Sequence, residues 1–88
     1  MTYTVAIYQD GDAYTVQVPA LPGCLTCGST LYEAFQMAEE AITGFLLVLQ
    51  DEGKPVPVEG DSVSVQMGEL VEMRLYRIDI PWPPADEI

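Results

Sequence analysis

A single long helix pattern in the middle of the chain constrains the fold more than any other feature. Apolar residues recur at helical spacing from Leu31 to Leu49. Thr30 and Glu33 have the T-x-x-E spacing of a capping box, in which each side chain satisfies the other residue's free backbone N–H. Gly53 is placed to end the helix. About 22 residues at ~1.5 Å each give roughly 33 Å, enough to cross a small sheet.

Alternating patterns on both sides of this helix predict β-strands. The segment "TYTVAIYQDGDAYTVQVP" is typical of a β-hairpin, because two alternating arms flank the turn signal Asp10-Gly11. Pro19 ends the second arm, since proline has no N–H for the sheet ladder, and "CLTC" can form a short third strand. Alternation returns over residues 63–67 and in "LVEMRLYRIDI". The latter places Val71, Met73 and Leu75 on one face and Glu72, Arg74 and Tyr76 on the other.

These patterns predict one α+β domain over residues 1–88. It would contain a three-stranded antiparallel start built on the hairpin, one long helix packed on the sheet, and one or more C-terminal strands, in the order β-β-β-α-β. A chain of 88 residues has the length of one domain. Residues 81–88, "PWPPADEI", form a proline-rich tail, because proline does not fit a central strand or a helix interior.

The outward side of the helix carries Glu33, Gln36 and Glu40, as expected for solvent, but small or apolar residues also occur there. Those that fall on or beside it are Met37, Gly44, Leu47 and Val48. The stretch "FLLVL" is therefore apolar all round, which is typical of a helix that is covered on all sides. We expect a second copy to cover it, in a dimer or a tetramer; the chain's own tail and another protein are the alternatives.

The charge of the chain is strongly acidic. Fourteen acids and three bases give a net charge of −11. Nucleic-acid binding depends on Lys and Arg contacts to phosphates, so we expect no direct nucleic-acid binding. The charge suits a soluble acidic protein, or one with a basic protein partner. Acids on exposed turns and the helix face would steer such a partner: Asp10, Asp12, Glu33 and Glu40.

The hydropathy pattern bears on localisation. No apolar run approaches the ~18 residues of a membrane span. The N-terminal residues have no basic start and no secretory apolar region. We therefore expect a cytoplasmic protein without a membrane anchor.

The C-x-x-C spacing of Cys24 and Cys27 raises the question of metal or redox chemistry. Structural zinc usually needs four Cys or His ligands, whereas the chain has two Cys and no His. We expect no metal and no other cofactor. A thioredoxin-like site places its first cysteine at a helix N-terminus, whereas this helix begins near Thr30, after both cysteines. A small thiol-redox protein using Cys24 and Cys27 remains an alternative.

Catalysis has no evident residue set. The neighbouring acids fall at turn or solvent positions: Asp10 with Asp12, Glu39 with Glu40, and Asp51 with Glu52. The chain has no His to serve as a neutral-pH base, no G-x-S-x-G and no phosphate-binding glycine loop. We therefore expect a binding protein rather than an enzyme.

The stretch "YTVQVPALPGCLTCGSTLYEAFQMAEEAI" resembles the HicB family of antitoxin-like domains. The family pattern is a hairpin strand, then P-x-L-P-G-C-x-x-x-G-x-T, then x-x-E-A and a helix. Nine positions agree with it: Pro19, Leu21, Pro22, Gly23, Cys24, Gly28, Thr30, Glu33 and Ala34. The resemblance covers residues 3 to about 58 well and includes the helix exit "DEGKPVPV".

Within this pattern, Cys24 is expected to be a small buried loop residue, whereas Cys27 falls at an unspecified position. Gly23 and Gly28 suit positions with positive φ or a close backbone approach.

The resemblance implies a partial RNase H-like fold and a function. HicB proteins bind and inhibit HicA toxins, which are small basic ribonucleases that degrade mRNA. We therefore predict an antitoxin-type binding module for a HicA-like toxin or another basic protein. A thiol-redox protein and an orphan self-associating domain are the alternatives. Many HicB proteins add a C-terminal DNA-binding domain; the sequence 1–88 contains no such module, so we do not expect it to bind DNA.

Overall fold

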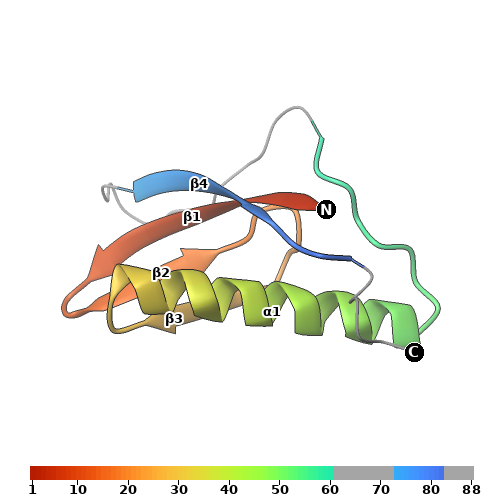
Figure 1. Cartoon of the computed structure of the whole chain (residues 1–88), viewed down its shortest axis with the longest axis horizontal. Helices are drawn as coiled ribbons and strands as arrows, with labels where there is room; N and C mark the ends of the chain where they lie inside the picture. Colours follow the sequence, from red (N-terminus) through yellow and green to blue (C-terminus); the bar gives the residue numbers. More distant parts are fainter. Residues whose placement is uncertain (61–72, 83–88) are drawn as a thin grey trace.

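One helix lies across a four-stranded antiparallel sheet (Figure 1). The computed structural model describes residues 1–60 and 73–82. The elements in chain order are β1 (Thr2–Asp10), β2 (Ala13–Gln17), β3 (Leu25–Gly28), α1 (Leu31–Asp51) and β4 (Met73–Asp79). The strands are ordered β3-β2-β1-β4. This arrangement confirms the predicted α+β class and the β-β-β-α-β order. The strand predicted over residues 63–67 and most of the proline-rich tail lie outside the described residues.

The hairpin of β1 and β2 closes through a two-residue turn. Asp10 pairs with Ala13, so Gly11 and Asp12 form the loop. Gly11 has a φ of 62°, and a glycine at the first loop position meets the requirement of a type II′ turn. The Asp-Gly signal therefore marks the turn, with Asp10 as the last residue of β1.

Strand β4 joins the sheet on the free side of β1. Its pairing runs from Thr2↔Asp79 to Tyr8↔Met73, and places Tyr76 opposite Val5 on the face toward the helix. The predicted alternation is present, but the core side of β4 carries Tyr76 rather than Leu75, which is 56% exposed. The Tyr76 ring meets Phe35 of α1 edge-on, with ring centroids 4.8 Å apart.

The core forms between the sheet and one stripe of the helix. Its fully buried members include Tyr3 and Val5 of β1, Val16 of β2, and Ile42 and Leu46 of α1. The N-terminal half of α1 contributes only small buried side chains, Ala34 and Ala38. Small residues let the helix approach the sheet closely, and α1 packs mainly against β3.

Both helix ends are capped by local hydrogen bonds. Thr30 Oγ1 accepts from Glu33 N at 3.0 Å, as predicted. The Glu33 carboxylate accepts from Ser29 N at 3.0 Å instead of from Thr30 N, so the predicted reciprocal box is shifted by one residue. At the other end, Gly53 has a φ of 72°, and its N–H donates to the carbonyl of Gln50. This bond and the 2.9 Å bond from Lys54 N to the carbonyl of Leu49 together form a Schellman motif.

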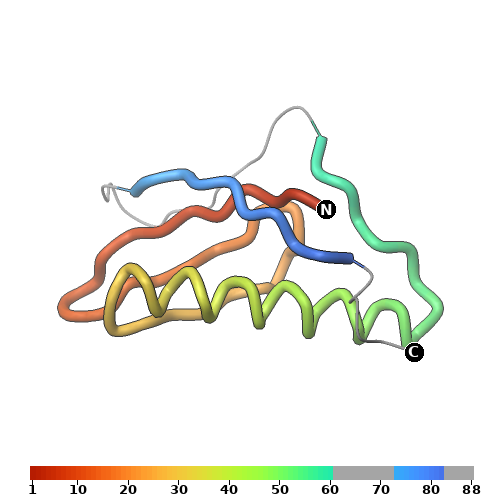
Figure 2. The backbone as a smooth tube through the Cα atoms, viewed as in Figure 1, coloured from red at the N-terminus to blue at the C-terminus, as the bar shows by residue number. Residues whose placement is uncertain are grey.

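The segment 54–60 runs from the end of α1 to the first half of β1 (Figure 2). Residues Met1 and Ile80 exchange two backbone hydrogen bonds. Hydrogen-bonded and non-hydrogen-bonded pairs alternate along an antiparallel ladder, so Thr4 belongs to a non-hydrogen-bonded pair and its N–H points away from β4. Strand β2 pairs with β1 only from Ala6 onward and does not reach Thr4. The carboxylate of Glu59, whose side chain is 6% exposed, fills this gap. It accepts from Thr4 N at 2.6 Å and from Thr4 Oγ1 at 2.8 Å.

The same segment also fixes Tyr3. The Tyr3 hydroxyl donates to the carbonyl of Pro57. Burial, and secondarily the negative charge of Glu59, raise the pKa of Tyr3 above its usual value. The hydroxyl therefore remains a donor at neutral pH, and the first half of β1 is held between β4 and the segment 54–60.

In the described residues, no helix is long and apolar enough to cross a membrane.

Candidate partner-binding surfaces

The loop that carries the family pattern is folded by its own backbone. Leu21 N donates to the carbonyl of Val18, and Cys24 N donates to the carbonyl of Leu21, both at 2.9 Å. Gly23 has a φ of 90°, a conformation that side-chain-bearing residues rarely adopt. Leu21 is buried, Pro22 is exposed and Pro19 is half-buried. These residues return the chain from β2 to β3 and present few polar groups to a ligand.

The end of the pattern fixes the start of the helix on the sheet. A Cβ atom at Gly28 would lie 2.5 Å from Ala34 N and 2.9 Å from Ala34 Cα, both backbone atoms. Ala34 is itself fully buried. Thr30 and Glu33 cap the same turn. The pattern therefore builds the scaffold, and the close approach expected of Gly28 is present.

The two cysteines point to opposite faces of the sheet. Cys24 is 4% exposed and belongs to the core under the helix. Cys27 pairs with Thr15, one position along from the core-facing Val16, so its side chain lies on the other face, where it is exposed. Both thiols are free. Across the described ranges, no group of three or more His, Cys, Asp or Glu side chains could hold a metal ion. This geometry does not suit a shared C-x-x-C site.

Cys27 is expected to react with Ellman's reagent rapidly, and Cys24 at least roughly tenfold more slowly, because the thiolate is the nucleophile. Burial raises the pKa of Cys24 above its usual value and also blocks the reagent. Stopped-flow absorbance resolves the two phases. Cys27→Ser should remove only the fast phase, and denaturant should merge both phases. A fast phase that survives in Cys27→Ser would contradict this assignment.

Three of the four predicted steering acids gather at one end of the molecule. Asp10 and Asp12 at the β1–β2 turn line a shallow depression with Glu33 of the first helical turn. Glu40 lies farther along α1 and lines a different groove. In residues 1–60 and 73–82, none of these four acids forms an ion pair. Their charge is therefore available to a partner.

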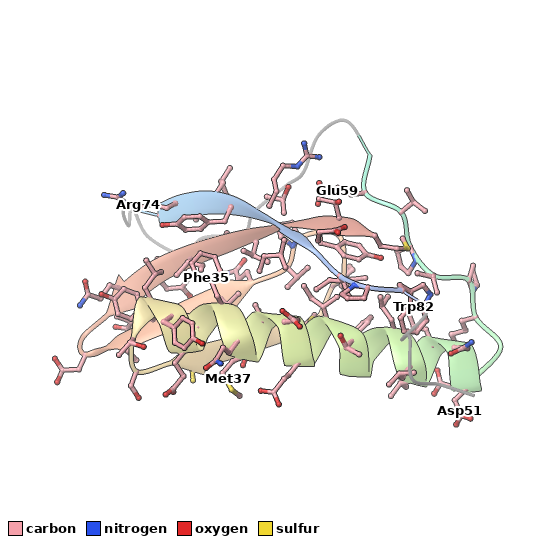
Figure 3. The ribbon with its side chains drawn as sticks, in the orientation of Figure 1. Phe35, Met37, Asp51, Glu59, Arg74 and Trp82 are labelled. Atoms are coloured by element: carbon pink, nitrogen blue, oxygen red, sulfur yellow. The ribbon has the colours of Figure 1, made fainter. Side chains whose placement is uncertain are left out.

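The four residues of the predicted oligomer interface do not all line one groove. The groove has a volume of about 490 Å³ and lies between the C-terminal half of α1 and the start of β3. Gly44 and Val48 line it, whereas the exposed Leu47 does not and instead lines a neighbouring depression with Val48. Met37 is half-buried and does not line the groove. Phe35 points from α1 toward the sheet, whereas Met37 projects on the other side (Figure 3).

Leu25 is the groove residue that sequence reasoning missed. It is 65% exposed and lines the groove from β3, although its side chain, like that of Cys27 two positions along, lies on the sheet face away from the helix. Its position depends on β3 being an edge strand, which no local sequence pattern reveals.

We expect the chain to form a homo-oligomer through this region, and replacing Leu47 by aspartate should then dissociate the assembly and leave the monomer folded. A two-fold contact repeats the same patch on both subunits, so each interface would receive two unpaired charges. Leu47 is 36% exposed in the single chain, so the monomer loses little packing. Light scattering over a range of concentrations measures the mass. Gln36→Asp is the control, since Gln36 is exposed and lines neither the groove nor the depression that contains Leu47. A clean monomer for the unaltered chain would contradict the expectation.

Comparison with known proteins gives a consistent family match. Residues 3–83 match the family model described as HicB_like antitoxin of bacterial toxin-antitoxin system. The UPF0150 protein Ta0767 of Thermoplasma acidophilum is 45% identical over 58 residues, which are 65% of this chain and 84% of that protein. A UPF0150 protein of Archaeoglobus fulgidus is 35% identical over 71 residues, which are 80% of this chain and 96% of that protein.

Solved structures share the fold. The N-terminal domain of the Burkholderia pseudomallei antitoxin HicB has a TM-score of 0.70 and 25% identity, covering 92% of this chain and 99% of that one. A chain of the HicA3 and HicB3 toxin–antitoxin complex has a TM-score of 0.68 and 22% identity, with the same coverage. The predicted resemblance and its fold are thus confirmed.

Proposed function

Because the chain belongs to the family of HicB-like antitoxins of bacterial toxin–antitoxin systems, we propose that it binds and neutralises a basic, mRNA-degrading HicA-like toxin. The family match over residues 3–83 carries this proposal, since it includes nearly the whole fold. The net charge of −11 supports the pairing with a basic protein. Both proteins would act in the cytoplasm, where the mRNA substrate lies.

Neutralisation in this proposal is a binding event. The acids Asp10, Asp12 and Glu33 at one end of the fold would attract the basic surface by which the toxin holds RNA. An antitoxin seated there excludes the RNA phosphates by competing for the same Lys and Arg side chains. No chemistry is required of the antitoxin, and the opposed cysteines contribute none.

Self-association belongs to a different part of the surface in this proposal. The groove lined by Gly44 and Val48 lies toward the C-terminal half of α1, away from the acidic end. A dimer or tetramer formed there leaves each acidic end free for one toxin. The complex would therefore contain one toxin per chain.

Co-expression with a HicA-like protein, sought among the genes beside the one that encodes this chain, tests the proposal. We expect the two proteins to copurify, and isothermal titration calorimetry to give one toxin per chain. The control is the same chain mixed with an unrelated basic protein of equal charge, which should bind weakly and lose binding in moderate salt. Failure of the HicA-like protein to bind better than the control would overturn the proposal.

A further inference from the structure

The three bases of this chain do not have equivalent surroundings. Lys54 Nζ lies 3.2 Å from a carboxylate oxygen of Glu52, and Arg77 lies 3.6 Å from Glu59. Arg74 has no carboxylate partner in residues 1–60 and 73–82. In a chain with fourteen acids, a base without an acidic neighbour in the described structure is the exception.

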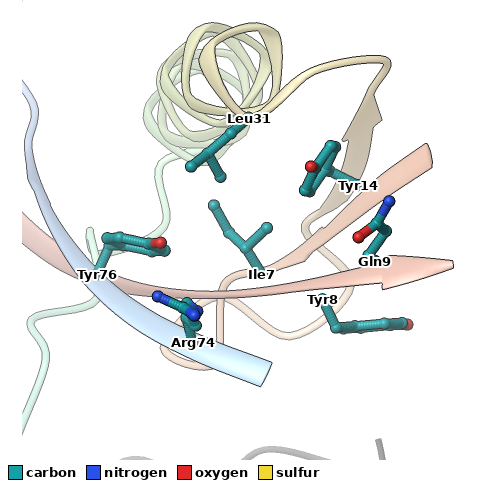
Figure 4. A pocket seen from close by; sticks show the side chains of 7 residues that line it. All are labelled: Ile7, Tyr8, Gln9, Tyr14, Leu31, Arg74 and Tyr76. Atoms are coloured by element: carbon teal, nitrogen blue, oxygen red, sulfur yellow. The ribbon is translucent and has the colours of Figure 1, made fainter. Parts of the chain in front are cut away.

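Arg74 lines a cavity of about 530 Å³ at the same end of the sheet as the β1–β2 turn (Figure 4). The polar groups around the cavity come from three strands: Tyr8 and Gln9 of β1, Tyr14 of β2, and Arg74 and Tyr76 of β4. Its apolar wall is formed by Ile7, which is 3% exposed, and by Leu31 of the first helical turn. Among the described residues that line the cavity, none is a carboxylate.

The lining suits an anion on an apolar stem. A guanidinium presents a planar fork of donors that matches a carboxylate, and phenol and amide groups add further donors. The edge-on contact with Phe35 holds the ring of Tyr76 in place. Ile7 and Leu31 supply contacts for methylene groups. A glutamate or aspartate side chain combines these two chemical features.

The cavity and the acidic depression flank the same helical turn. Leu31 lines the cavity, and Glu33 lines the depression together with Asp10 and Asp12. A partner protein that covers the acidic depression therefore also reaches the cavity. This continuity favours a side chain of the protein partner over a free small molecule.

We propose that the Arg74 cavity receives an acidic side chain of the toxin. This contact would fix how the acidic surface of the chain aligns with the basic surface of the toxin. The proposal rests on the proposed function. It assigns one reversed charge pair: the antitoxin supplies the cation and the toxin the carboxylate. Such a reversed pair gives specificity, because a basic protein without that acid would leave the guanidinium unpaired on binding.

The reversed pair predicts an effect opposite to that of net charge. Arg74→Ala makes the chain more negative, which should not slow the encounter with a basic toxin. Loss of the carboxylate contact should accelerate dissociation by roughly 10- to 100-fold. Arg74→Lys keeps the charge but loses the planar fork, so its dissociation rate should be intermediate.

Surface plasmon resonance with a catalytically inactive HicA-like toxin measures both rates. Lys54→Ala is the matched control, because it removes the same charge from the far end of α1. We expect faster dissociation for Arg74→Ala only, with unchanged thermal unfolding. A dissociation rate for Arg74→Ala equal to that of Lys54→Ala, or slower than that of the parent, would overturn the cavity assignment.

A second measurement separates this proposal from the proposed function. If the parent chain binds no HicA-like toxin, the proposed function fails, and the cavity is tested with N-acetylglutamate followed by NMR. Shifts centred on the side chains of Gln9 and Arg74 that vanish in Arg74→Ala support the carboxylate site. No shifts at these groups would overturn it.

Discussion

Replacing Gly28 by alanine is expected to lower the free energy of unfolding by about 3 kcal/mol, the upper part of the range for overpacking a closely packed site. The added Cβ would lie 2.5 Å from Ala34 N, which is part of the helix backbone and cannot rotate away. Relief requires the first turn of α1 to move off β3, and Ala34 would leave the core. Domains of this size have little stability in reserve.

Urea denaturation followed by circular dichroism measures this loss. Gly44→Ala is the matched control, because nothing lies within 4 Å of a Cβ atom at Gly44. The same change there should raise the stability of the monomer by about 0.5–1 kcal/mol, since alanine is the better helix former. Two glycines would thus respond to one substitution with opposite signs. Equal or greater stability of Gly28→Ala than of the parent would contradict the observed packing of α1 on β3.

Neutralising the steering acids is expected to slow association with the toxin by about 10- to 100-fold at low salt. The variant carries Asp10→Asn, Asp12→Asn, Glu33→Gln and Glu40→Gln. The difference in association rate between the variant and the parent should disappear as the salt concentration rises, because the screening length falls from ~30 Å at 0.01 M to ~3 Å at 1 M. Dissociation should change much less. Glutamine at position 33 keeps an acceptor for Ser29 N, so the helix start should survive.

The control variant neutralises four acids that are not predicted to steer the partner: Glu39→Gln, Asp51→Asn, Glu52→Gln and Asp79→Asn. Both variants have the same net charge, so a difference between them measures where the charge lies. Stopped-flow or surface plasmon resonance at several salt concentrations provides the rates. Equal slowing by both variants would reduce the effect to net charge. Association that ignores salt would remove the electrostatic account altogether.

Local signals predicted the elements whose causes are local. The turn at Gly11 and the cap at Thr30 depend on residues within a few positions, and both occur where the sequence indicates. The helix end at Gly53 is equally local. The donor to the Glu33 carboxylate differs from the predicted one by a single position, because Ser29 N and not Thr30 N makes the bond.

Features that depend on pairing between distant segments could not be predicted. The register of β4 on β1 decides that Tyr76 faces the helix and that Leu75 does not. The Glu59 contact with Thr4 joins residues 55 positions apart. The Arg74 cavity draws its lining from three strands and the helix, so no single stretch of sequence contains its pattern.

Neutralisation of a HicA-like toxin by this chain is measured directly as inhibition of RNA cleavage. The purified toxin is held at a fixed concentration with a fluorescent RNA reporter, and the chain is titrated into it. The account predicts that cleavage falls linearly and stops at one chain per toxin. Cleavage that continues at its full rate in a large excess of the folded chain would contradict the account.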